Sequence, residues 1–222
     1  AGLPLEGPLG VRGSLVVMAS PAAEAPMQMS WDLELDVENG RLLTATPVEH
    51  IHGGVRLMGR QTGEGVFAHG ELQVDSAIVR GVQLTSVQGP FWVDGRRVVF
   101  GALADRDARE QAPRQITARA VGGLVSLDGE LSLFGDCPFD IRATLANAEL
   151  TEIAQQLAPH HQQLRGKTFA LVNMSGTSAG QHTWHGDGQL SLREADLYEL
   201  PAMMTLLKLL SIQRPNATAF TN

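Results

Sequence analysis

Apolar and polar residues alternate with a period of two along much of this chain. From Met29 to Val37 every second residue is apolar, and Asp32, Glu34 and Asp36 lie between them. A β-strand turns successive side chains to opposite faces of a sheet, so this pattern predicts a strand with one apolar and one polar side. The same reasoning predicts strands near residues 15–18, 51–59, 66–79, 87–93, 98–100, 116–121, 124–134, 139–145, 167–174 and 182–192.

A short pattern of Gly, Glu or Gln, Leu, Ser or Gln, and Leu or Val occurs three times at an even interval. The copies begin at Gly70, Gly129 and Gly188, which are 59 positions apart, and a looser copy begins at Gly13. An even interval of this length predicts a repeated supersecondary unit. A glycine inside a strand marks a bulge or a close approach of another backbone, and we expect this at Gly70.

The turns and loops have their own composition. Asn39-Gly40 is typical of a hairpin turn, and Asp94-Gly95 has the same character. Residues 1–13 are rich in Gly and Pro and predict a linker or a partial strand, whereas the charged residues 104–114 predict an exposed loop.

Two short helices are predicted. The first begins at Thr151, which we expect to act as the N-cap, and runs to about Gln163. The second is opened by Pro201 and continues to Ile212. This second helix is too short to cross a bilayer and too apolar to stand alone in water, so it predicts a segment that covers or plugs an apolar surface.

The fold class that follows is mainly β: a curved, mostly antiparallel sheet, forming an open groove or half-barrel, built from repeated strand units with two short helices. We expect residues 1–222 to be one β-rich segment of a longer protein, with possible sub-repeats over 13–103 and 115–222. A repeat array of this kind builds a long surface and does not frame a single compact active site.

Composition removes several functional classes. The net charge is −7 and no run of Lys or Arg occurs, which argues against a nucleic-acid partner because phosphate binding needs clustered cations. The single cysteine, Cys137, excludes an internal disulfide and a cysteine-based zinc site.

No motif with catalytic or metal-binding spacing is found. His50 and His52 are two residues apart and would share a strand face, but no carboxylate cluster accompanies them. The chain contains no Gly-x-Ser-x-Gly elbow, and Gly63-x-Gly65 lacks the following helix of a dinucleotide site. We therefore expect no enzyme activity, no catalytic residue, no cofactor and no metal.

The stretch from Leu164 to Phe220 resembles the C-terminal module of AsmA-like proteins. The matching residues are Leu164-Arg165-Gly166, Ser175-Gly176, Gly186-Asp187-Gly188-Gln189-Leu190-Ser191-Leu192, Ala195-Asp196-Leu197-Tyr198-Glu199-Leu200-Pro201, a Leu-rich helix and Ala219-Phe220. Such proteins are similar to the repeating β-groove, or bridge-like, lipid-transfer proteins and to TamB-like proteins. The resemblance covers about a quarter of the chain.

This resemblance implies an elongated curved sheet with an apolar concave face. It implies the periplasmic part of an envelope protein anchored in the inner membrane, with the anchor outside this segment. The partners it implies are phospholipid or another acyl-chain lipid, adjoining repeats of the same chain and possible envelope proteins. The implied function is lipid transport and outer-membrane biogenesis, and the family offers no catalytic motif to carry over.

Candidate residues for a lipid groove are the apolar members of the alternating stretches. They are Trp31, Leu33, Leu35, Val55, Leu57, Leu72, Val74, Phe91, Val93, Leu131, Leu133, Phe139, Ile141, Leu190 and Leu192. The candidate residues for the helical plug or cover are Met203, Met204, Leu206, Leu207 and Leu210. Each lining residue could instead belong to an ordinary core, and the helix could instead contact a membrane or lipid directly.

Two other functions fit the same pattern. One is a structural or interaction β module that spaces or docks envelope proteins without carrying lipid. The other is a closed β-sandwich with an ordinary core and a small ligand. An apolar face that is continuous favours lipid, whereas a face interrupted by charges favours the spacer.

Overall fold

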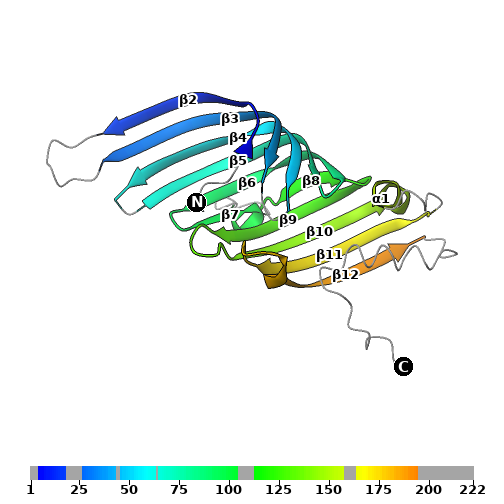
Figure 1. Ribbon diagram of the computed structural model, residues 1–222. Coiled ribbons are helices and arrows are strands. Elements are labelled where there is room, and N and C mark those ends of the chain that lie inside the picture. The colour runs from blue at the N-terminus through cyan, green and yellow to red at the C-terminus, as the bar shows by residue number, and fades with distance from the viewer. Residues whose placement is uncertain are drawn as a thin grey trace.

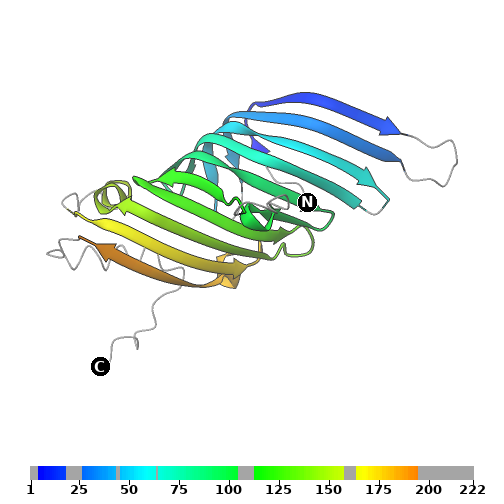
Figure 2. The ribbon, with the colours of Figure 1, turned by 180° about the vertical axis from the view of Figure 1, so that it is seen from behind.

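In a computed structural model, the described residues form one antiparallel sheet of 12 strands with one α-helix. The structure describes residues 5–18, 27–43, 46–63, 65–104, 113–157 and 164–194. The strand order is β1-β3-β4-β5-β6-β7-β9-β10-β11-β12, with β2 also paired to β3 and with β8 paired to β6 and β9. Figure 1 shows these strands side by side in a single curved layer from the blue β2 to the orange β12, and Figure 2 shows the same layer from behind.

The elements of the described residues occur in the following order along the chain. They are β1 (Leu5–Glu6), β2 (Leu9–Met18), β3 (Gln28–Leu42), β4 (Val48–Thr62), β5 (Gly65–Val79), β6 (Val82–Asp94), β7 (Arg97–Phe100), a 3-10 turn (Gly101–Leu103), β8 (Ile116–Ala120), β9 (Gly123–Ser132), β10 (Phe139–Glu149), α1 (Leu150–Leu157), β11 (Lys167–Gly176), a second 3-10 turn (Gln181–Thr183) and β12 (His185–Arg193).

The predicted fold class is confirmed: the chain is mainly β and its sheet is curved, antiparallel and not closed into a barrel. The described residues contain one α-helix, not the two that were predicted. The second predicted helix, residues 201–212, lies outside the described residues. The described strands also form a single sheet, so they do not build the closed sandwich considered above.

Tight hairpins join several neighbouring strands. Arg80 and Gly81 connect β5 to β6, and both have positive φ, 51° and 83°, as the central residues of a type I′ turn require. Val121 and Gly122 connect β8 to β9 in the same way, with φ of 46° and 72°. A β-branched residue rarely adopts positive φ, and Val121 does so while only 7% exposed in the apolar core, so its packing offsets the strain.

Backbone irregularities recur inside the long strands. Asn39, His50, Ser86 and Asn147 have φ between 51° and 57°, and the pairing register shifts beside each of them. An extra residue at a bulge bends the strand and increases its twist. Asn and His enter this left-handed region more readily than most residues with a side chain, so the sequence allows the sheet to curve at three of these positions.

The hairpin turn predicted at Asn39-Gly40 is wrong. Strand β3 continues through both residues to Leu42, and Gly40 pairs with Ile51 of β4. The pair Asn-Gly favours positive φ in a bulge as readily as in a turn, and sequence composition does not separate the two. Residues 1–13, predicted as a linker or a partial strand, contain β1 and the beginning of β2 at Leu9.

Aromatic rings on one side of the sheet lie over glycines of the neighbouring strand. The pairs are Trp31 over Gly59, Phe91 over Gly70, Phe100 over Gly129 and Phe139 over Gly176. A Cβ atom on Gly70 would lie 2.7 Å from Cζ of Phe91, and one on Gly129 would lie 2.8 Å from Cζ of Phe100. The close approach expected at Gly70 is therefore confirmed, and in the first two copies the repeated glycine makes room for a ring.

Helix α1 packs on one end of the sheet and closes its only buried apolar cluster among the described residues. The buried members are Ala120, Val121, Ala148, Leu150, Ile153, Ala154 and Leu164, and Val82, Leu84, Val125, Leu145 and Leu192 pack against them. Thr151 was expected to cap this helix, but the helix begins at Leu150. The Thr151 hydroxyl instead donates a hydrogen bond to the Leu164 carbonyl oxygen, 2.5 Å away, and ties the helix to the segment before β11.

The ring-over-glycine packing predicts a cost for filling the space under Phe91. We expect Gly70→Ala to lower the free energy of unfolding by about 1–3 kcal/mol, the range for overpacking, because the new methyl group meets both the backbone carbonyl oxygen of Arg56 and the Phe91 ring. Urea denaturation measures this loss. Gly10→Ala is the control, since its Cβ would lie 3.6 Å from the nearest atom, Asp36 Cβ, which is an ordinary contact. An equal loss in both variants would contradict the close packing described at Gly70.

Candidate apolar binding face

The pairing register decides which side chains share a face of the sheet. Residues directly opposite each other in antiparallel strands point to the same side. Leu35 of β3 lies opposite Val55 of β4, which in turn lies opposite Leu72 of β5. Further along the sheet, Phe91 of β6 lies opposite Phe100 of β7. These residues belong to one face, which we call the apolar face.

The register places all but one of the predicted lining residues on the apolar face. They are Trp31, Leu33, Leu35, Val55, Leu57, Leu72, Val74, Phe91, Val93, Leu131, Phe139, Ile141, Leu190 and Leu192. The exception is Leu133, which follows the end of β9 and is 41% exposed. The predicted plug residues, Met203, Met204, Leu206, Leu207 and Leu210, lie outside the described residues.

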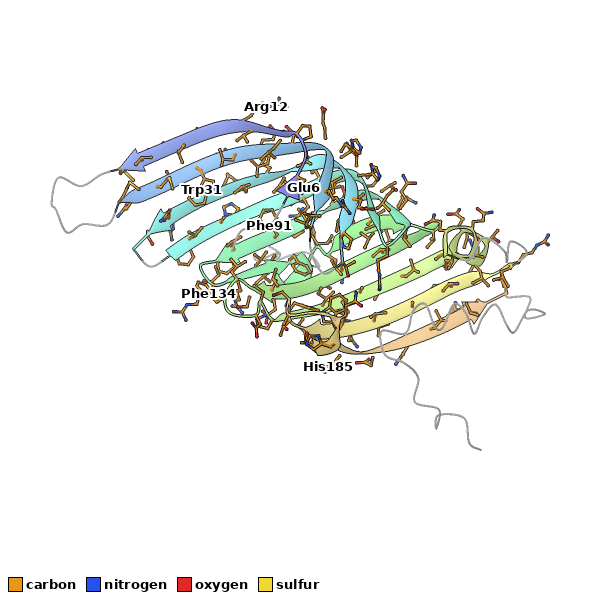
Figure 3. All side chains as sticks on the ribbon, in the orientation of Figure 1. Glu6, Arg12, Trp31, Phe91, Phe134 and His185 are labelled. Carbon is orange, nitrogen blue, oxygen red and sulfur yellow. The ribbon has the colours of Figure 1, made fainter. Side chains whose placement is uncertain are left out.

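The same face carries residues that the sequence analysis did not single out. They are Leu9, Val11, Leu15 and Val17 of β2, Val98 and Phe100 of β7, Ala143 and Leu145 of β10, and Val172 and Met174 of β11. Each belongs to an alternating stretch, so a strict count of every second residue would have found them. Figure 3 shows Trp31 and Phe91 on the inner strands, with Arg12 and His185 near opposite edges of the sheet.

The apolar face is uninterrupted by charge. At the paired positions of the described strands it carries no Asp, Glu, Lys or Arg, and its polar side chains are Gln61, near the end of β4, and Thr168, which is 3% exposed. Trp31 Nε1 and Thr168 Oγ1 are buried and have no hydrogen-bond partner within the described part of the chain. The face therefore offers dispersion contacts and apolar burial, and almost no hydrogen-bonding groups.

Most of this face is not covered by another layer of the described structure. Helix α1 packs only at one end, on the cluster around Ala148 and Leu145. At the β2 edge the side chains of Val11 and Leu15 are 56% and 57% exposed. The inner residues, such as Leu57 and Phe91, are half-buried by their own neighbours. A contiguous apolar surface larger than a few hundred Å² is uncommon on a monomer and marks an interaction site.

The opposite face, which we call the polar face, carries the charged residues of the same strands. Its ion pairs include Arg12–Asp36, Arg56–Asp32, Arg41–Glu49, Arg97–Glu130, Arg114–Glu71 and Lys167–Glu149. Their side chains are about one-third to three-quarters exposed, so each pair contributes at most about 1 kcal/mol to stability. The polar face is therefore solvated around these ion pairs, whereas Val99 of β7, on the same face, is only 5% exposed.

A hollow on the polar face is lined by residues that already form ion pairs. Its lining includes Arg56, His69, Glu71, Trp92 and Arg114, and Arg114 binds Glu71 through two nitrogens, at 3.0 and 3.3 Å, across this region. The cations that would attract an anionic ligand there are already balanced by a carboxylate.

His50 and His52 lie beside a bulge in β4, where His50 has positive φ. The ring Nδ1 of His50 is 2.8 Å from Oδ1 of Asn39 on the neighbouring strand. Over the described ranges, no group of three or more His, Cys, Asp or Glu side chains is placed to hold a metal ion.

Within the same ranges, no helix has the length and apolar character needed to span a membrane.

Comparison with known proteins adds no relative. No protein-family model matches the chain, and no curated protein and no solved structure is detectably similar to it. The resemblance to AsmA-like proteins therefore stays a prediction from the motifs in Leu164–Phe220. Part of that stretch is described: residues Lys167–Gly176 and His185–Arg193 form the paired strands β11 and β12.

Two substitutions at neighbouring positions of β4 test whether the apolar face is open to solvent and to apolar ligands. We expect Leu57→Glu to reduce binding of an apolar dye such as Nile red, because it places a carboxylate among the apolar side chains. We expect a loss of only about 1 kcal/mol in unfolding free energy, since the new carboxylate still reaches water. Met58→Glu is the control, because Met58 is the next residue of β4 and is 39% exposed on the polar face.

Dye titration and urea denaturation of both variants provide the measurement. Equal dye binding by the two variants would show that the dye does not use the apolar face. A loss of several kcal/mol for Leu57→Glu would indicate that this face is sealed against solvent.

Proposed function

We propose that the apolar face binds the acyl chains of lipids, and that the chain is a non-enzymatic segment of a cell-envelope protein that holds or conducts them. The observation that supports this most is the continuity of the face: from β2 to β12 its paired positions carry no charged residue. A spacer or docking module needs no such surface. The motif resemblance to AsmA-like proteins supports the same reading and adds the periplasm, the inner-membrane anchor and outer-membrane assembly.

The dimensions of the face suit hydrocarbon chains. The nine steps from β2 to β12, at about 4.8 Å each, extend about 40 Å across the strands. One leaflet of a bilayer has a hydrocarbon depth of about 15 Å, half of the roughly 30 Å core. The face is therefore longer than a single acyl chain and offers room for more than one.

The chemistry of the face predicts broad specificity. Each buried CH₂ group contributes about 0.8 kcal/mol, so a long tail binds tightly without any hydrogen bond. The scarcity of polar groups on the face means that a headgroup finds no partner there and stays in water. Binding that depends on the tail and not on the headgroup is what a carrier of several lipids requires.

Quenching by brominated lipids tests which face contacts the tails. Trp31 lies on the apolar face, whereas Trp92 lies opposite His69 and Val99 on the polar face. We expect phospholipid with bromine on its tails to quench the fluorescence of a variant that keeps only Trp31. We expect little quenching in a variant that keeps only Trp92, because the sheet separates that ring from the lipid.

The variants are Trp92→Phe with Trp184→Phe, and Trp31→Phe with Trp184→Phe. The same phospholipid without bromine controls for changes of fluorescence on binding. Quenching that is equal at the two positions, or absent at Trp31 while lipid is bound, would contradict the proposal.

Native mass spectrometry of the purified protein distinguishes lipid binding from the spacer function. We expect copurified phospholipid to stay bound and to appear as protein peaks heavier by the mass of a phospholipid. We expect Leu57→Glu to lower the abundance of these peaks relative to Met58→Glu. A spectrum free of lipid, under conditions that retain lipid on a control protein, would favour the spacer.

A further inference from the structure

Strand β2 leaves one edge of the sheet open. In the described chain it pairs with β3 alone, over Leu9 to Met18, and all ten of its residues are exposed. The backbone N–H and C=O groups on its outer side are those that a further strand could use. This edge lies at the opposite end of the sheet from β12 (Figure 1).

The edge at β2 lacks the usual protection against strand addition. Natural edges carry charges, proline or bulges that discourage pairing. The only charged side chain of β2 is Arg12, and its guanidinium binds Asp36 of the adjacent strand at 3.1 Å. Between Leu15 and Met18 four consecutive apolar side chains are 51–57% exposed, and two of them, Val16 and Met18, lie on the polar face.

We propose that a second copy of this chain pairs with β2 in an antiparallel arrangement, about a two-fold axis perpendicular to the sheet near Gly13. With Gly13 opposite itself, Leu9 would lie opposite Val17 and Val11 opposite Leu15, all on the apolar face. On the polar face, Arg12 would lie opposite Ser14. The pattern of β2 is therefore complementary to itself in this register.

This arrangement also explains the exposed Val16. In the same register Val16 would lie opposite Gly10 of the second copy, so a branched side chain would cover a glycine. That is the packing that Phe91 and Gly70 already make within the sheet. The Gly10 backbone is open enough to allow it, because the nearest atom to a Cβ at this position would be 3.6 Å away.

The two-fold symmetry of such a dimer determines how the apolar faces of its two copies lie relative to each other. A two-fold axis perpendicular to the sheet keeps both apolar faces on the same side, so the pairing joins them into one surface. The contact is isologous and closes after two copies. The pairing uses the edge and not the apolar face, so it does not depend on lipid binding.

Disulfide trapping in the 222-residue chain tests the register. Opposite Cα atoms in antiparallel strands are about 4.5–5.5 Å apart, within the range that a disulfide spans. With Cys137→Ser as background, we expect a mixture of Arg12→Cys and Ser14→Cys chains to give a crosslinked dimer on mild oxidation. A mixture of Arg12→Cys and Ser191→Cys chains is the control, because Ser191 is exposed on the polar face of β12. Crosslinking no greater than in this control would overturn the proposal.

Sedimentation analysis tests the dimer without a crosslink. We expect the unmodified chain to form dimers as its concentration rises, and Val16→Lys to weaken the association by about tenfold or more, since an edge lysine opposes strand addition. Ser191→Lys places the same charge on the other edge and should leave the association unchanged. A chain that stays monomeric, or a Val16→Lys variant that associates as the unmodified chain does, would overturn the proposal. The apolar-dye titration of Val16→Lys keeps this result separate from loss of lipid binding.

Discussion

The structure depends on one constraint: every strand of a single sheet must keep its apolar side chains on the same side as those of its neighbours. Because side chains alternate along a strand, a slip of one residue in any pairing would turn a whole row to the other face. The register from β2 to β12 shows no such slip: Leu33 faces Leu57, Val98 faces Leu131, and Ala170 faces Leu190. The continuity of the apolar face is a consequence of this agreement.

The bulges and glycines adjust the sheet without breaking that agreement. At Ser86 and Asn147 a residue with positive φ shifts the local pairing, yet Leu84 and Ala148 beyond them still pack in the cluster on the apolar face. The glycines under Phe91 and Phe100 allow large rings to lie close to the sheet. These features let the sheet bend while its apolar face stays smooth and free of charge.

An apolar face that is open to water is unfavourable in free energy, and the surrounding structure limits the apolar area that is exposed. The inner side chains such as Leu57 are half-buried by their neighbours, and α1 covers the end near Ala148, so the exposed apolar residues of this face gather along β2. The ion pairs of the opposite face contribute little to stability, since they are exposed to water. A ligand with a hydrocarbon chain would remove apolar surface of this face from water.

The sequence by itself determined the class of fold and almost all of the apolar face, because period-two alternation is a local property of the residues within each strand. It also located the close approach at Gly70. It did not determine that Asn39-Gly40 is a bulge, that Thr151 binds the Leu164 carbonyl, or that His50 meets Asn39, because each depends on a strand or segment distant along the chain. Only the tertiary structure decided that the apolar sides join into one surface, since alternation does not reveal whether a second layer covers them.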